Sequence, residues 1–481
     1  MSKAKELCAD NAYDAVVIGS GPNGVSAALV LAQQGKKVVL LEAAPTIGGG
    51  CRSAELTLPG FVHDICSSIH PMAIGSPYLR TLPLDKFGLR WVHPDAAYAH
   101  PLDNGTASVA YRSIEKTAET LGRDGEAYAS LMHSLNPNWE TVCEALLQPM
   151  KMFRHPFALA SFGLKALMSA RFIADSHFRD EPARALLAGV CAHAELPFDT
   201  FASSSFGLVL GATAHIVGWP MPEGGAQSLM NALVGLFKSL GGEVVTGCAV
   251  DDLSDLPVAK IIMCDISPRQ LLRIAGARLP ASYVGALNSY VQGPGVFKLD
   301  YALDGPIPWT ADDCRKAGTV HLGGTFEEIA ESELACWQGR ISQRPYVLLV
   351  QNATFDRSRA PAGKHTCWAY CHVPNGSRFD MTPYIENQIE RFAPGFKDLI
   401  LARHSFSPQA MEAYNANYIG GDINGGAFIP SQLITRPVAR VIPYATPVEG
   451  LYLCSASTPP GGGVHGMCGY YAAHAAIRGW R

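Results

Sequence analysis

Three glycines and one glutamate near the start of the chain have the types and spacing needed to bind a dinucleotide. Gly19, Gly21 and Gly24 fit the pattern G-x-G-x-x-G. The first glycine of this pattern permits a tight turn, the second lets the backbone approach a pyrophosphate, and the third lets a helix pack closely on a strand. Glu42 follows roughly 20 residues later, where a carboxylate can accept hydrogen bonds from ribose hydroxyls. No basic residue directly follows Glu42, so FAD or NAD is favoured over NADP.

The segments around these glycines predict the elements that must position them. The apolar run 15–18 is typical of a buried parallel strand. Residues 24–34 predict a helix whose N-terminal amides point at the pyrophosphate, and residues 37–41 predict a second strand. Strand, glycine turn, helix, strand and acid therefore occur in the order of a Rossmann-like unit.

A second glycine loop follows this unit and favours a flavin. Gly48, Gly49 and Gly50 form a backbone-only loop, and Arg52 lies where a guanidinium could pair with a pyrophosphate or flank a flavin ring. The alternative for Arg52 is an ordinary surface arginine. Plain NAD dehydrogenases do not need this second loop, so it indicates FAD.

A second match to the dinucleotide pattern lies near the C-terminus at Gly461, Gly463 and Gly466. Residues 455–460 separate it from the strand predicted over 451–455, whereas a dinucleotide loop follows its strand at once. A helix is predicted over 464–477. We therefore expect this segment to close over the same nucleotide rather than to bind a second one.

Composition limits the function classes. The formal net charge of −4 gives no support to nucleic-acid binding. Charged residues make up 17% of the chain, below the roughly 25% usual for soluble domains, and hydrophobic residues make up 48%. A large core explains this balance, and an apolar substrate cavity or a membrane-facing patch would explain it too. A chain of 481 residues allows two or three domains or one interleaved unit.

Cysteines and apolar segments predict where the protein works. The 13 cysteines are scattered and include no C-x-x-C pair, so we expect reduced thiols and no metal site. No secretory signal and no apolar run of about 18 residues occurs, which predicts a cytoplasmic protein. Residues 151–171 combine basic and apolar side chains without an acid. Such a helix can lie on a membrane surface, or it can be an ordinary surface helix.

Two further motifs resemble a known family. The stretch E-A-x-x-x-x-G-G over 42–49 and the stretch P-G-F-x-x-D over 59–64 are similar to motifs of the FAD-dependent oxidoreductases of the phytoene desaturase and amine oxidase superfamily. The phytoene-dehydrogenase-like branch is the most similar part. Those relatives have arginine directly after the double glycine, whereas this chain has Gly50 there and Arg52 two residues on.

The resemblance implies roles for later residues. It places Gly225, in a P-x-G-G motif, beside the flavin, and Val250 against the adenine through its backbone. It places Gly462, Gly463 and Val464 at the flavin ring and ribityl-pyrophosphate. His465 lies among these glycines and is the candidate proton donor or acceptor for catalysis. A structural imidazole bonded to backbone is the alternative for His465.

The predicted fold is α/β, with a GR2-type FAD-binding Rossmann-like domain interleaved with an α+β substrate domain. We assign residues 10–80, 219–285 and 436–481 to the FAD domain. Residues 81–218 and 286–435 form the substrate domain, with a membrane-facing helical part near 151–178. The resemblance implies an FAD-dependent desaturase or isomerase of a polyene or isoprenoid. The alternatives are an amine oxidase and a non-catalytic module that binds prenylated proteins, as GDP-dissociation inhibitors do.

Overall fold

A five-stranded parallel sheet forms one half of the computed structural model, which describes residues 12–135, 139–149 and 162–479. The strand order is β16-β10-β1-β2-β9. The strands are β1 (Ala15–Ile18), β2 (Val38–Leu41), β9 (Glu243–Val245), β10 (Ile261–Cys264) and β16 (Leu451–Leu453). They come from the three sequence segments that we assign to the FAD domain, so distant parts of the chain build one sheet.

Helices cover both faces of this sheet, which explains why its strands are apolar throughout. Ala15 and Val17 of β1 pack in the core formed with α2 (Pro22–Gln33) and α11 (Ala226–Ser239). Val16 and Ile18 face the opposite core. The helices on that second side are α12 (Pro268–Ala275) and α13 (Ala281–Asn288). The C-terminal helix α19 (Met467–Ile477) packs so tightly on α2 that a Cβ at Gly469 would lie 1.8 Å from the Asn23 carbonyl oxygen.

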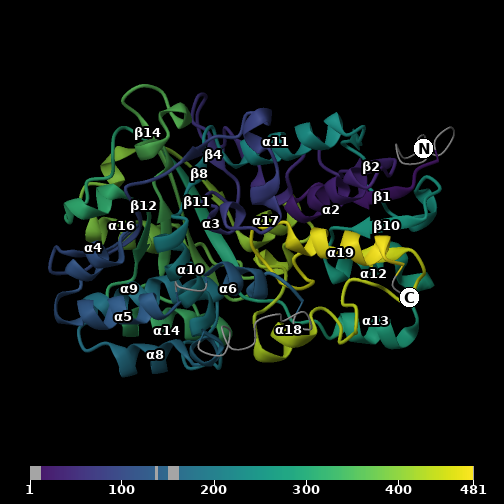
Figure 1. Cartoon of the computed structure of the whole chain (residues 1–481). Coiled ribbons are helices and arrows are strands. Elements are labelled where there is room, and N and C mark those ends of the chain that lie inside the picture. The colour runs from purple at the N-terminus through teal and green to yellow at the C-terminus, as the bar shows by residue number, and fades with distance from the viewer. Residues whose placement is uncertain (1–11, 136–138, 150–161, 480–481) are drawn as a thin grey trace.

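A seven-stranded mixed sheet forms the other half of the molecule (Figure 1). Its strand order is β15-β11-β14-β13-β12-β6-β7. The neighbours are antiparallel except for β12 and β6, which run parallel. The strands are β6 (Ala96–Pro101), β7 (Ala107–Tyr111), β11 (Gly295–Leu303), β12 (Ala317–Leu322), β13 (Val347–Val350), β14 (His365–Val373) and β15 (Ile400–Phe406).

The half that contains the seven-stranded sheet also contains most of the remaining helices. The described part of residues 114–146 contains three α-helices, and Gly122, with a positive φ of 58°, lies at the break between the first two. The larger helices of this half are α4 (Ile114–Glu119), α5 (Gly125–Leu135), α6 (Trp139–Leu146), α8 (Ala170–His177), α9 (Glu181–Cys191), α10 (Ser204–Ile216), α14 (Phe326–Trp337), α16 (Thr382–Phe392), α17 (Pro408–Tyr414) and α18 (Pro430–Thr435).

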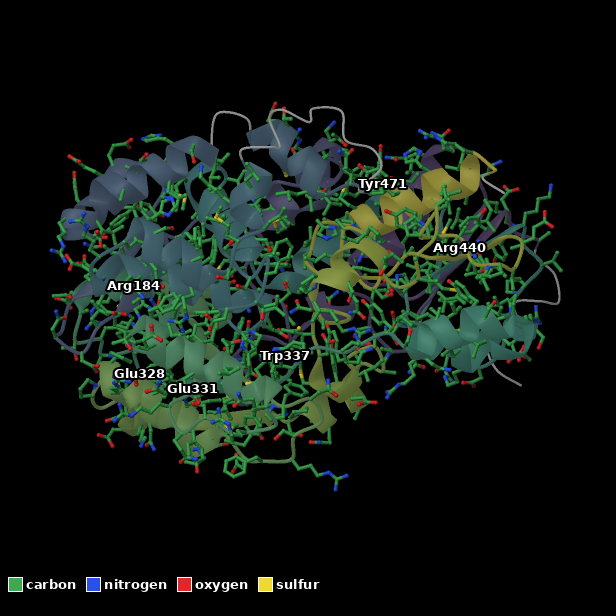
Figure 2. The ribbon with its side chains drawn as sticks, turned by 90° about the horizontal axis from the view of Figure 1, so that it is seen from below. Arg184, Glu328, Glu331, Trp337, Arg440 and Tyr471 are labelled. Carbon is green, nitrogen blue, oxygen red and sulfur yellow. The ribbon has the colours of Figure 1, made fainter. Side chains whose placement is uncertain are left out.

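The two halves are joined side by side along the molecule. Figure 2 shows Arg440 and Tyr471 in the half that holds α19, and Arg184, Glu328 and Glu331 in the half that holds the second sheet. Across the described residues, no helix is long and apolar enough to cross a membrane. Most of the basic, apolar segment 151–171 lies outside the described residues.

Candidate cofactor and substrate site

One large cavity lies between the two sheets, with a volume of about 1520 Å³. Sites for a single drug-sized ligand usually measure ~300–1,000 Å³, so this cavity has room for a dinucleotide and a second molecule. Its walls come from both halves of the chain. Of the predicted cofactor-binding residues, those that line it are Gly19, Gly21, Glu42, Gly49, Arg52, Val250, Gly462, Gly463 and Val464, together with the catalytic candidate His465.

The first glycine loop has the geometry that its sequence predicts. Gly19 adopts a φ of 97°, which favours glycine. A Cβ at Gly24 would lie 2.1 Å from the Gly19 carbonyl oxygen, so the third glycine permits the close packing of α2 on β1. Gly24 itself does not line the cavity. Gly21 is the N-cap of α2 and has no side chain with which to cap this helix end, although the carboxylate of Asp265 accepts the Gly24 N–H of the first turn at 2.9 Å.

Glu42 stands at the carboxyl end of β2, as predicted for the ribose-binding acid. Its carboxylate accepts hydrogen bonds from the backbone N–H groups of Ser20, at 2.9 Å, and Ala44, at 2.8 Å. The side chain of Arg52 donates a third bond, 3.0 Å long. These bonds fix the carboxylate at the cavity wall, where the hydroxyls of a ribose can reach it.

Arg52 is 5% exposed, so the alternative of an ordinary surface arginine is wrong. The structure pairs its guanidinium with Glu42 at 3.0 Å, and the Arg52 Nε has no hydrogen-bond partner among the described residues. A Cβ at Gly49 would lie 2.9 Å from the Gly21 Cα atom, so the two glycine loops touch. An unpartnered donor beside two such loops fits the oxygens of a dinucleotide.

The segment before α11 differs from the implied arrangement. Gly225 does not line the cavity. It faces Ser53 instead, whose Oγ would lie 2.4 Å from an added Cβ. Asp64 explains the difference, because its carboxylate accepts the Ala226 N–H at 2.8 Å and so caps the start of α11. This helix end is therefore occupied by a protein carboxylate and not left open to a cofactor.

The C-terminal loop closes the cavity from the opposite side. Gly462 packs on the glycine-rich loop 418–428, since an added Cβ would lie 2.8 Å from the Asn424 carbonyl oxygen. Asp422 orders that loop by accepting the Gly425 and Gly426 N–H groups at 3.1 and 2.9 Å. The loop 418–428 therefore forms a turn at the cavity.

His465 has both ring nitrogens bonded to backbone. The Met467 N–H donates to Nδ1 at 3.0 Å, and Nε2 donates to the Gly461 carbonyl oxygen at 3.2 Å. Burial lowers the pKa of His465 to about 4, so the ring is uncharged at neutral pH. These bonds favour the structural alternative, and a catalytic role for His465 stays a prediction.

Val250 borders the cavity through a short segment after β9. Its carbonyl oxygen accepts a hydrogen bond from Arg273 at 3.3 Å. Arg273 also pairs with Asp251 at 2.7 Å. The contact between Val250 and an adenine stays a prediction.

Asp265 was not predicted from the sequence, although it directly follows β10. Its Oδ2 accepts the Gly24 N–H at 2.9 Å and would lie 2.6 Å from a Cβ at Gly21. The removal of the carboxyl from bulk water and the nearby Glu42 raise the pKa of Asp265 to about 7. In a parallel sheet the carboxyl ends of the strands lie along one edge, and ligands bind there. Because Asp265 follows β10 at that edge, this rule could have identified it.

The second sheet supplies an apolar floor to the cavity. Trp368 and Tyr370 lie two residues apart on β14, so both side chains project from the same face. Their rings are stacked, with centroids 5.6 Å apart and an angle of 12°. The apolar side chains that line this part of the cavity are Phe162, Leu167, Phe206, Val209, Leu210, Trp219, Leu348, Val350, Trp368, Tyr370, Phe428, Leu433 and Ile434.

The cavity thus fits a flavin dinucleotide along the parallel sheet and a second molecule against the mixed sheet. This combination defines the class of FAD-dependent oxidoreductases with a two-part, interleaved fold. FAD supplies the acceptor for a hydride, and the chain supplies the contacts that position it.

Comparisons with known proteins agree with this class. The family model of an NAD(P)-binding Rossmann-like domain matches residues 17–82. The chain is 26% identical to the pyridine nucleotide-disulfide oxidoreductase domain-containing protein 2 of Rattus norvegicus, over 98% of this chain and 94% of that protein. It is 24% identical to a lycopene-forming phytoene desaturase of Pseudescherichia vulneris, over 94% of this chain and 96% of that protein.

Solved structures share the fold over nearly the whole chain. An oxidoreductase from Methanosarcina mazei has a TM-score of 0.67 at 17% identity, covering 96% of this chain and 99% of its own. The cyclohexylamine oxidase of Brevibacterium oxydans has a TM-score of 0.58 at 15% identity, covering 97% and 99%. The chain is thus similar over nearly its whole length to oxidoreductases such as phytoene desaturase, and it is an FAD-dependent oxidoreductase.

Asp265 leads to a prediction about cofactor binding. A diphosphate brings negative charge to the loop that Asp265 touches, so the protonated carboxyl is the form compatible with FAD. The other titratable groups near this carboxyl are Glu42, Cys264, Cys454 and Cys468. We expect the affinity for FAD to fall as the pH rises above about 7, by at most about tenfold per pH unit for one proton.

Fluorescence titration of the apoprotein with FAD at several pH values measures this dependence. Asp265→Asn keeps an acceptor for the Gly24 N–H but cannot ionise, so its affinity should be independent of pH across the same range. An equally steep profile in Asp265→Asn would show that another group is responsible.

Proposed function

We propose that the protein acts on a largely apolar substrate of polyene or isoprenoid type by hydride transfer to FAD. Loss of a hydride to FAD and of a proton to solvent from adjacent carbons gives desaturation, whereas return of the hydride to another carbon gives isomerisation without net oxidation. The observation that carries this proposal is the composition of the cavity. Of the described residues that line it, the acidic ones are Glu42 and Asp265, and both lie at the dinucleotide end. The wall formed by the second sheet is apolar and aromatic, as an apolar molecule requires.

An amine oxidase is the second candidate, and the stacked pair of Trp368 and Tyr370 favours it. Aromatic rings can bind an ammonium group through their faces. However, Lys298 already lies 5.3 Å from the centroid of the Trp368 ring, and no carboxylate lines this part of the described cavity. A cationic substrate would lose its hydration without a compensating charge, so the apolar substrate is favoured.

A non-catalytic module that binds prenylated proteins is the third candidate. Such a module does not need a flavin site, whereas this chain keeps two touching glycine loops and a C-terminal loop around the dinucleotide space. These features support an enzyme.

Anaerobic mixing of the FAD-loaded enzyme with candidate substrates tests the proposal. We expect an isoprenoid of suitable length to bleach the visible absorption band of the oxidised flavin, and primary amines to leave it unchanged. Reduction by amines alone would favour the second candidate, and a protein that does not take up FAD would favour the third.

We further propose that the mouth of the cavity rests on a membrane surface. Leu167, Ile434 and Val441 line the cavity and are also 46%, 64% and 72% exposed. Leu164, one turn before Leu167, is 66% exposed. Arg171 does not contribute free charge, because it pairs with Asp199 at 2.8 Å and Glu327 at 2.7 Å. An exposed apolar rim around an apolar cavity would let a lipid-soluble substrate enter without crossing water.

Replacement of rim residues tests this contact. We expect the double variant Leu164→Ser, Ile434→Ser to lose most of its co-flotation with anionic liposomes, because about 2–3 kcal/mol of apolar transfer energy is lost for each side chain. Val258→Ser is the matched control, since Val258 is 82% exposed but does not line the cavity. Unchanged flotation of the double variant would contradict the proposal.

A further inference from the structure

Two imidazole rings lie in contact at the wall of the cavity, away from the residues assigned to the dinucleotide. His193 follows α9 and lines the cavity, and His321 lies on β12 behind it. Their Nε2 atoms are 3.1 Å apart. Burial lowers the pKa of His193 to about 3 and that of His321 well below its ordinary value, so both rings are uncharged. Two uncharged rings at this distance share a single proton, which one ring donates and the other accepts.

Gly189 determines which ring donates. A Cβ at Gly189 would lie 2.8 Å from the Nδ1 atom of His321, so this nitrogen faces the Cα atom of a glycine. It is buried and has no hydrogen-bond partner among the described residues. A buried N–H without a partner is rarer and more costly than an unused acceptor. The proton of His321 is therefore on Nε2, which donates to Nε2 of His193.

This bond leaves the proton of His193 on its Nδ1 atom. Nδ1 has no hydrogen-bond partner within the described chain, and it is not among the atoms that are closed off from solvent. The edge of Trp219 fixes the ring, with centroids 5.7 Å apart and an angle of 79°. Trp337, labelled in Figure 2, holds the same loop by donating its Nε1–H to the Glu195 carbonyl oxygen at 2.8 Å.

We infer that His193 presents an N–H donor to the cavity, and that the substrate therefore carries a hydrogen-bond acceptor, such as a carbonyl, ether or hydroxyl oxygen, on an otherwise apolar skeleton. This inference rests on the proposed function, because it concerns the substrate bound in the same cavity. It makes His193 a residue that determines specificity, and it distinguishes an oxygenated substrate from a pure hydrocarbon.

Three small-molecule probes that share a farnesyl hydrocarbon chain test the inference in the FAD-loaded protein. Farnesene has no polar atom, farnesyl methyl ether has an oxygen that can only accept, and farnesylamine is a cation that can only donate. Binding is measured by the change of the flavin spectrum. We expect His193→Leu to weaken the binding of the ether by about tenfold, as the loss of one hydrogen bond implies, and to change the binding of farnesene by less than about twofold. His193→Gln keeps an N–H donor and should restore part of the affinity for the ether.

The outcomes separate this inference from the proposed function. Equal effects of His193→Leu on the ether and on farnesene, or tighter binding of farnesylamine than of the ether to the wild type, would overturn the inference and leave the apolar cavity in place. Binding of none of the probes would overturn both. The nitrogen chemical shifts of His193 and His321 give an independent readout, in which we expect the proton on Nδ1 of His193 and on Nε2 of His321. The reverse assignment would also overturn the inference.

Discussion

Replacement of Gly21 by alanine is expected to weaken FAD binding by about a hundredfold. Gly21 has a φ of −66°, which alanine adopts without strain, so the effect arises from space alone. The new Cβ would lie 2.6 Å from Oδ2 of Asp265 on one side of the loop that meets the pyrophosphate. Overpacking of this kind costs up to about 3 kcal/mol. The loop must shift to relieve it and then loses its close approach to the pyrophosphate, so we expect a loss of similar size, about two orders of magnitude, in affinity. Titration of the apoprotein with FAD measures it.

Two comparisons make this test specific. Gly285→Ala adds a Cβ where no atom lies within 4 Å, so FAD binding should not change and the helix should gain about 1 kcal/mol. In a protein that already carries Asp265→Ala, the cost of Gly21→Ala should be smaller, because the clashing carboxyl is absent. Full affinity in Gly21→Ala would show that the pyrophosphate does not lie at this loop.

Replacement of Asp64 by alanine is expected to lower the free energy of unfolding by about 3–5 kcal/mol. Asp64 is fully buried and pairs with Arg359 at 2.8 Å. It also accepts hydrogen bonds from Ser53 at 2.7 Å and from the Ala226 N–H at 2.8 Å. Asp64 therefore connects three parts of the chain: the segment at Ser53, the start of α11 at Ala226, and the segment at Arg359. Its removal leaves the buried charge of Arg359 with only the more distant carboxylate of Asp356, at 3.9 Å. Denaturant unfolding measures the loss.

The pH dependence of this contribution follows from the pKa of Asp64. Burial alone would raise the pKa, but Arg359 and the hydrogen bonds from Ser68 and Ala226 outweigh it and lower the pKa to about 2, below the ordinary value of 3.8. The stabilisation is present above pH 3.8 and is lost as the pH falls toward 2.

A variant at an exposed ion pair is the control for Asp64→Ala. Asp304→Ala removes the exposed pair with Lys364 and should change the free energy of unfolding by less than about 1 kcal/mol. An equal loss in both variants would contradict the role of Asp64.

Local patterns were sufficient to predict the first half of the site. The glycines at 19, 21 and 24 and the acid at 42 are close in sequence, and their strand, turn and helix follow from short-range rules. The alternation in β14 also contained a usable signal, since Trp368 and Tyr370 are two residues apart and must share a face. An aromatic pair in the cavity could therefore have been predicted.

Contacts between residues that are distant in sequence could not be predicted, because they depend on how the elements pack. Gly225 faces Asp64, which lies 161 residues earlier in the numbering, and does not line the cavity. His193 and His321 meet because α9 packs against β12. Neither contact has a signature in the residues around it. Arg52 pairs with Glu42 because the second glycine loop folds back on the first.

The flavin content of the purified protein tests the FAD site most directly. We expect a yellow protein that releases one FAD per chain on denaturation, and an apoprotein that takes up one FAD again. A colourless protein that is folded but does not bind added FAD would contradict the assignment of the cavity to FAD.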